Sequence, residues 1–223
     1  NKFILVFAYL GFLAFLFEGS ARLAFSIPQV ARRLQANHYY TYRRNWVQQH
    51  QKSGVEVYYT FDRYDPSKGW MPKANLKDIK VFNQKILNTN SKGLRGTRDF
   101  PYIKNKETLR ILILGDSFTF GDEVSDDETY SHYLQEMLPH TEVINMGVHG
   151  YGHDQMLILL KEEGIKYHPD IVIIGFLPLD MPRNLLEFRD FAKPRFVLDR
   201  GELKLTGTPV PRPENILQWD WAI

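Results

Sequence analysis

The amino-acid sequence predicts an α/β fold, a three-layer sandwich built on a parallel sheet and preceded by one N-terminal transmembrane helix. An uncharged apolar stretch opens the chain, and short apolar runs alternate with helical patterns from Leu109 onward. The composition is that of a globular protein, because 43% of the residues are hydrophobic and 24% are charged. We therefore divide the chain into a transmembrane anchor (1–25), an amphipathic and irregular connecting and cap region (26–108) and an α/β domain (109–223).

The composition also excludes several classes of protein. The 223 residues contain no cysteine, which excludes a disulfide framework, a thiolate zinc site and a cysteine nucleophile. The 28 Lys and Arg residues against 26 Asp and Glu give a net charge of +2, which is too balanced for a nucleic-acid-binding protein defined by its charge. We expect no nucleic acid, metal or cofactor to bind.

The opening segment, residues 3–17, reads FILVFAYLGFLAFLF. At about 1.5 Å per residue a helix of this length is shorter than the roughly 30 Å hydrocarbon core, and because the chain starts with Asn rather than Met we expect a longer natural span. Three interpretations compete: a secretory signal cleaved near Ser20-Ala21, a retained anchor and a buried core helix. The segment is apolar on all sides, which favours the anchor, with membrane lipid as the partner of residues 3–17.

The segment after the anchor has a helix start at Ser26-Ile27-Pro28. Apolar residues recur from there to Trp46 with arginines between them, so it is either an amphipathic helix on lipid headgroups or a surface helix packed on the soluble part. Residues 48–108 hold short β-rich pieces such as 55–59, which we interpret as an irregular cap. The candidate chemistry lies downstream, so we expect a single-pass anchor with a periplasmic or otherwise extracytoplasmic domain.

The α/β pattern begins at Leu109. It predicts strands over 109–114, 142–146 and 170–176, helices over 129–138 and 154–166, and a β-hairpin over 196–205. Strands that alternate with helices form βαβ units with parallel strands. The functional site of such a sheet lies beyond the carboxyl ends of the strands.

Each predicted strand end carries residues capable of chemistry. After the first strand, Gly115-Asp116-Ser117 can present a serine hydroxyl as a nucleophile on a tight turn, beside backbone N–H groups. The alternative is that Asp116 or Ser117 only caps the next helix. The second strand runs into NMGVHGYG at 145–152, whose glycines permit sharp turns and the close approach of a ligand. The third strand is followed by a loop that contains Asp180, Arg183 and Asn184.

Taken together, these three strand ends resemble those of the SGNH (GDSL-type) hydrolases, a flavodoxin-like fold. The sequence NSKGLRG at 90–96 resembles the lead-in of membrane-anchored members, and the likeness covers about residues 88–200. The resemblance implies that Ser117 is the nucleophile that attacks an ester carbonyl. It also implies that the N–H groups of Ser117 and Gly150 donate to the oxyanion, with Asp116 and Asp180 in support.

Two departures from the family pattern leave two functional hypotheses. Leu179 stands before Asp180 where the family places an oxyanion-hole asparagine, and no Asp-x-x-His motif follows Asn184, so we expect that motif either beyond Ile223 or missing from the protein. The first hypothesis is a membrane-anchored serine esterase or acyl hydrolase, with acetyl esters or acyl transfer on cell-envelope glycans as the substrate class that the resemblance implies. The alternative is a catalytically impaired accessory subunit of a larger membrane protein complex.

The remaining titratable residues have plainer interpretations. His149 and His153 flank the glycine turn and could replace the missing base, but we favour solvent-exposed turn histidines. Gly150 and Gly152 make a helix with two metal ligands at that spacing unlikely to form. The other histidines, His50 among them, are expected at the surface, and the acidic residues of 122–128 are expected in a solvated loop and helix start.

Overall fold

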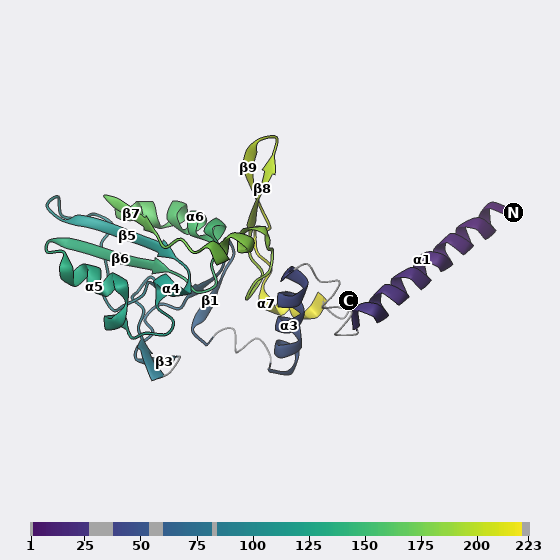
Figure 1. Cartoon of the computed structure of the whole chain (residues 1–223), viewed down its shortest axis with the longest axis horizontal. Helices are drawn as coiled ribbons and strands as arrows, with labels where there is room; N and C mark the ends of the chain where they lie inside the picture. The colour runs from purple at the N-terminus through teal and green to yellow at the C-terminus, as the bar shows by residue number, and fades with distance from the viewer. Residues whose placement is uncertain (1, 27–37, 54–59, 82–83, 220–223) are drawn as a thin grey trace.

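The computed structural model describes residues 2–26, 38–53, 60–81 and 84–219 (Figure 1). It is a mixed α/β chain whose centre is a three-stranded parallel sheet in the order β6-β5-β7. The strands of this sheet are β5 (Leu109–Gly115), β6 (Thr141–Gly147) and β7 (Ile171–Ile174). The helices between them are α4 (Ser117–Phe120), α5 (Tyr130–Met137) and α6 (His153–Glu162), with short 3-10 segments η3 (Asp126–Glu128) and η4 (Gly164–Tyr167). The predicted strand–helix alternation and parallel pairing are confirmed.

Strand β5 shows why the apolar run at 109–114 forms the centre of the sheet. Successive side chains of a strand point to opposite faces, so an entirely apolar run suits a strand that is covered on both sides. Leu112 and Leu114 join a buried cluster with Met156 and Leu159 of α6. Ile111 and Ile113 join a second cluster that includes Leu134 and Leu138, which come from α5 and its C-terminal end.

Strand β7 departs from the prediction. A strand was predicted over 170–176, but β7 spans only Ile171–Ile174, and three of its four side chains are exposed. The reason is its place at the edge of the sheet, where it pairs with β5 on one side and with no described strand on the other. Its apolar sequence is that of a covered strand.

The region before β5 contributes to the same core. It contains α3 (His38–Ser53), β1 (Asp62–Asp65), β2 (Gly69–Pro72), β3 (Ile79–Val81) and β4 (Lys85–Leu87), with β1–β2 and β3–β4 as antiparallel pairs. Trp70 of β2 is fully buried in the cluster that contains Leu112. Trp46 of α3 is buried in that cluster too, with its ring edge-on to Phe188 at 5.8 Å. These contacts support a helix packed on the soluble part rather than one on headgroups.

Two further predictions for this region have different outcomes. The predicted helix start at 26–28 lies outside the described residues except for Ser26, and the predicted β-rich piece at 55–59 lies outside them entirely. His50 was expected at the surface, and this is wrong: its ring stacks on Trp46 at 4.3 Å and its Nδ1 lies 2.8 Å from the Trp46 carbonyl oxygen. Trp46, one turn earlier in the same helix, therefore packs on a ring that the polar sequence around His50 suggested was exposed.

The N-terminal helix is longer than its uncharged stretch. Helix α1 (Lys2–Ser26) has 25 residues, which at about 1.5 Å per residue exceeds the roughly 30 Å hydrocarbon core. The segment Val6–Ala24 is long and apolar enough to cross a membrane, and none of it is buried against the described part of the chain (Figure 1). The interpretation as a buried core helix is therefore wrong. Glu18 and Arg22 pair along the helix at 2.8 Å.

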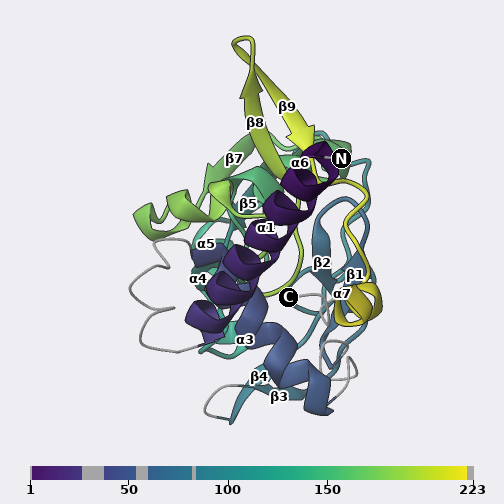
Figure 2. The same ribbon diagram turned by 90° about the vertical axis from the view of Figure 1, so that its right-hand side faces the viewer.

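After β7 the chain forms η5 (Pro178–Leu185), the hairpin β8 (Arg195–Asp199) and β9 (Glu202–Thr206), and α7 (Pro213–Trp219). The hairpin predicted over 196–205 is confirmed. Its two turn residues, Arg200 and Gly201, have φ values of 51° and 88°, as the tightest hairpin turns require. Figures 1 and 2 both show the hairpin projecting from the body of the molecule.

Candidate functional site

The candidate site lies where the parallel strands end. Strands β5 and β6 pair in register, with Leu109 opposite Thr141 and Gly115 opposite Gly147. Both of these terminal glycines lie directly under α4, because a Cβ at Gly147 would come within 2.4 Å of the Phe120 nitrogen and one at Gly115 within 1.9 Å of Thr119 Oγ1. Glycine at the two strand ends therefore lets α4 rest on the sheet edge.

Ser117 is the first residue of α4, and Asp116 is its N-cap. The Phe118 N–H donates to Asp116 Oδ1 at 3.0 Å, and Asp116 is almost fully buried. The helix-cap interpretation thus applies to Asp116, and it leaves Ser117 half-exposed with its Oγ 3.5 Å from Asp116 Oδ2. Ser117 thus carries its hydroxyl at the start of a helical turn, directly after the central strand, and its role as a nucleophile stays a prediction.

Arg183 joins the loops that follow all three strands. Its Nη1 lies 3.3 Å from Asp116 Oδ2 and 2.7 Å from Asp180 Oδ1, and it donates to the Tyr151 carbonyl oxygen at 2.9 Å. Asp180 is fully buried. Burial raises the pKa of Asp180, and Arg183 partly opposes this rise. The predicted supporting residues Asp116 and Asp180 are therefore brought together, and Arg183 holds both.

Gly150 occupies a position that needs glycine. Its φ is +74°, and a Cβ would meet Asp190 Oδ2 at 2.1 Å. The neighbouring His149 carbonyl oxygen accepts a hydrogen bond from Trp70 Nε1 at 3.0 Å. Strand β2 therefore helps to fix the turn that contains Gly150. The structure gives no contact between Gly150 and Ser117, and the role of Gly150 as an oxyanion donor stays a prediction.

His149 is not the exposed turn histidine that the sequence suggested. Only 20% of its side chain is exposed, and its Nε2 donates to Asp62 Oδ2 at 2.9 Å. Burial lowers the pKa of His149, but the carboxylates of Asp62, Asp122 and Asp190 outweigh that effect and raise the pKa to about 9. Asp62 lies 87 residues earlier in the chain, so no local pattern reveals this pair.

His153 and Leu179 complete the predicted surroundings of Ser117. The His153 ring faces Phe176 at 5.1 Å and its Nδ1 lies 3.4 Å from Asn184 Nδ2. Leu179, on η5, is 76% exposed, so the residue before Asp180 lies at the surface. Within the described part of the chain, the hydrogen bonds of Ser117 Oγ include no histidine.

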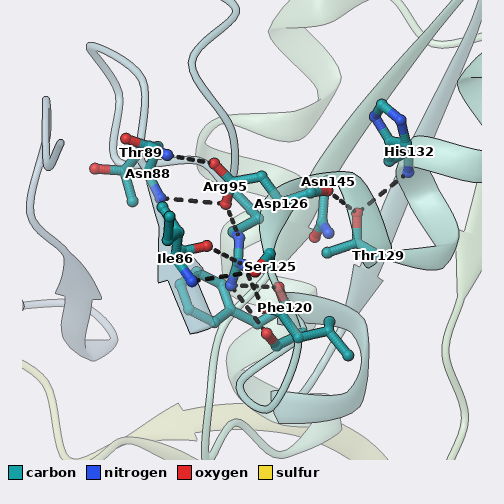
Figure 3. Close-up of polar contacts among 12 residues, drawn as sticks. Ile86, Asn88, Thr89, Arg95, Phe120, Ser125, Asp126, Thr129, His132 and Asn145 are labelled. Atoms are coloured by element: carbon teal, nitrogen blue, oxygen red, sulfur yellow. Dashed lines mark hydrogen bonds and ion pairs between the residues drawn. The ribbon is translucent and has the colours of Figure 1, made fainter. Parts of the chain in front are cut away.

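Arg95 is a site residue to which the sequence assigned no role (Figure 3). Its buried guanidinium donates to Asp126 Oδ1 at 2.6 Å and to the carbonyl oxygens of Phe120 and Gly121 at 3.2 and 3.0 Å. It also donates to the carbonyl oxygens of Ile86 and Val124, at 3.3 and 2.8 Å. The arginine therefore fixes the C-terminal end of the helix that Ser117 begins. In the sequence, the position of Arg95 within the motif NSKGLRG at 90–96 was the one indication that this residue has a role near the site.

The acidic segment 122–128 agrees in part with the expected solvated loop and helix start: Glu123, Asp127 and Glu128 are exposed, and η3 begins at Asp126. Asp126 is the exception, because its carboxylate is held in a hydrogen-bond network. Besides Arg95, its carboxylate accepts hydrogen bonds from the Asn88 backbone N–H at 3.2 Å and from Asn88 Nδ2 at 2.6 Å (Figure 3). Asn145, at the end of β6, donates to the Thr119 carbonyl oxygen at 2.7 Å and so binds α4 from the sheet side. Polar side chains from three separate segments hold this one helical turn.

Comparisons with known proteins leave the candidate site to be judged on its geometry. The chain matches no protein-family model and no curated protein. In the part of the chain that the structure describes, no group of three or more His, Asp and Glu side chains is placed to hold a metal ion. The arrangement brings together a serine hydroxyl, buried carboxylates and one shared arginine at the carboxyl ends of the parallel strands.

Proposed function

We propose that the chain is a membrane-anchored serine esterase of the SGNH type, with α1 as its anchor and the α/β part outside the cytoplasm. The parallel sheet would be the core of the three-layer sandwich expected of that family. Ester-linked acyl groups on cell-envelope glycans, acetyl groups first, are the substrate class that we infer from the resemblance. Transfer to water gives hydrolysis, and transfer to a sugar hydroxyl gives acyl transfer.

The observation that carries this proposal is the position of Ser117. It is half-exposed at the start of a helical turn that is held at its cap by Asp116 and at its other end by Arg95. A nucleophile held in one orientation lowers the entropic cost of attack. In the proposed step Ser117 Oγ bonds to the acyl carbon, the bond from that carbon to the alcohol oxygen breaks, and the serine proton passes to the alcohol.

The proton transfer needs a base that the described contacts of Ser117 do not supply. Asp116 Oδ2 lies 3.5 Å from Ser117 Oγ, but this carboxylate already pairs with Arg183 at 3.3 Å and caps α4 through its other oxygen. His149 is hydrogen-bonded to Asp62 through its Nε2, at 2.9 Å. The proposal therefore requires a histidine that the described contacts do not include, in the role of the family's Asp-x-x-His motif.

A second candidate function is an accessory subunit of a membrane protein complex. Two observations favour it: the lack of a histidine on Ser117 among the described contacts, and the exposed apolar side chains on and after β7. These side chains are Ile171, Val172, Ile174, Phe176, Leu179, Met181 and Leu185. Large exposed apolar groups are typical of surfaces that bind another protein.

Labelling with a fluorophosphonate probe separates the two functions. The full chain in detergent micelles is treated with the probe, next to Ser117→Ala and to Ser91→Ala, which removes the same atom from an exposed serine. We expect covalent labelling of the wild-type chain and of Ser91→Ala, and none of Ser117→Ala. If a known serine esterase is labelled under the same conditions and the folded wild-type chain is not, the esterase proposal is wrong and the accessory subunit is favoured.

A further inference from the structure

A small cavity lies beside the candidate site without being part of it. Its volume is about 70 Å³, and Ser117 is not among the residues that line it. Phe61, Leu87 and Phe120 provide apolar walls, so the cavity is bounded by the cap hairpins on one side and by α4 on the other. Its polar lining comes from Asp62, Asp122 and His149.

The buried carboxylate of Asp62 indicates that a ligand of this cavity would donate hydrogen bonds. Its side chain is 4% exposed, and its Oδ2 is paired with His149. Its other oxygen, Oδ1, is buried and has no hydrogen-bond partner among the described residues. A buried carboxylate oxygen without a donor costs free energy, because it loses the hydrogen bonds that it made to water. A donor in the cavity would recover them.

The charges around the cavity favour a cation. The carboxylates of Asp62 and Asp122 outnumber the one imidazolium, His149, that lines the cavity with them. Arg95 attracts Asp122, but its N–H groups are occupied by Asp126 and by backbone carbonyls, and Asp190 near His149 pairs with Arg189. The cavity therefore has one more negative group than positive when both carboxylates are ionised.

Asp122 is a partly buried carboxyl whose ionised form is disfavoured. Burial raises the pKa of Asp122 to about 6, against the opposing effects of His149 and Arg95 and with smaller contributions from Asp62 and Asp116. A cation in the cavity would stabilise the ionised form. The rings of Phe61 and Phe120 provide apolar surface for the rest of such a ligand.

We propose that this cavity binds a primary alkylammonium group, whose N–H bonds donate to Asp62 and Asp122 and whose short alkyl part lies against Phe61 and Phe120. Carboxylates provide the charge and the acceptors, and the apolar walls exclude water from them. The site does not use Ser117, so it is independent of the esterase proposal, and either can fail without the other.

Calorimetric titration of the full chain in detergent micelles tests the ligand class. The probe is n-propylammonium chloride, and n-propanol is the uncharged control of nearly the same size. We expect saturable binding of n-propylammonium at about pH 7 and at least about tenfold weaker binding of n-propanol. Equal binding of the two probes, or no saturable heat with n-propylammonium, would overturn the proposal.

The pH dependence and one variant identify the residues. Asp122 is mostly ionised at about pH 7 and mostly protonated at about pH 5, while His149 stays protonated at both, so binding is expected to weaken about tenfold between them. Asp122→Asn is expected to lose about tenfold in affinity at about pH 7, and the exposed-site control Asp127→Asn none. Wild-type affinity in a folded Asp122→Asn would contradict the assignment.

Discussion

Arg95 shows how much one side chain can contribute to the candidate site. It is 2% exposed, forms five hydrogen bonds and lies over the Phe120 ring at 5.2 Å. We expect Arg95→Ala to lower the free energy of unfolding by about 3–5 kcal/mol, because it leaves Asp126 and several carbonyls without their donor. Arg95→Lys keeps the charge but not the planar set of donors, and should recover only part of the loss. Urea unfolding measures both.

Arg98 provides the matched control for that measurement. Its side chain is 56% exposed and pairs with Glu142 at 3.0 Å. An exposed ion pair contributes little, so Arg98→Ala should cost less than about 1 kcal/mol. Equal losses for Arg95→Ala and Arg98→Ala would show that the buried guanidinium does not hold α4 as described.

The His149–Asp62 pair makes stability depend on pH in a defined window. The pKa of His149 is raised from 6.5 in the unfolded chain to about 9 in the folded one, so the folded state binds the proton more tightly. The pair therefore contributes up to about 3 kcal/mol to the free energy of unfolding. This contribution is complete below about pH 6.5 and is lost as the pH rises through 9. Chemical unfolding from pH 6 to pH 9 should show this decline in the wild-type chain and not in His149→Gln. Parallel curves for the two proteins would refute the pairing.

At the scale of single elements, β7 is the strand whose surroundings do not fit its sequence. Ile174 is 55% exposed at an open edge, and such an edge promotes association between chains. We expect Ile174→Lys to reduce concentration-dependent self-association, measured by sedimentation velocity, while stability changes by less than about 0.5 kcal/mol. The neighbouring Ile173→Lys should instead unfold the chain, because Ile173 packs against Ile113 and Val143. Unchanged self-association in Ile174→Lys would mean that the edge of β7 is not adhesive.

The sequence predicts elements well where one local pattern decides them. The apolar runs of β5 and β6 and the turn Arg200-Gly201 can each be predicted from the residues of that segment alone. The exposure of β7 and the His149–Asp62 pair depend on segments that meet only in the folded chain, so no window of sequence contains them. The local sequence also placed Asp116 and Ser117 at the end of a strand, and their catalytic roles stay predictions, whereas the contacts of Arg95 with α4 could not be foreseen.

At the scale of the whole molecule, α1 has two interpretations, a retained membrane anchor and a cleaved signal, which experiment can distinguish. If α1 is a retained anchor, the full chain should remain in the membrane pellet after alkaline carbonate extraction, and a chain without residues 1–26 should appear in the supernatant. N-terminal sequencing of the chain recovered from membranes is the second measurement. A start after Ser20 in all recovered protein would instead support a cleaved signal.

The one-turn length of α4 has a consequence for when the candidate site comes into existence. A helix of four residues does not form by itself, because nucleation costs more than a single turn returns. Its order depends on Arg95, which precedes it, and on Arg183, which is synthesised well after it and holds its cap through Asp116. The contact of Arg183 with Asp116, 67 residues earlier, forms only when the chain between them closes into a loop. The serine therefore acquires its orientation only as the surrounding chain completes its folding, and a nascent or partly folded chain carries the GDS sequence without the geometry that would make it reactive.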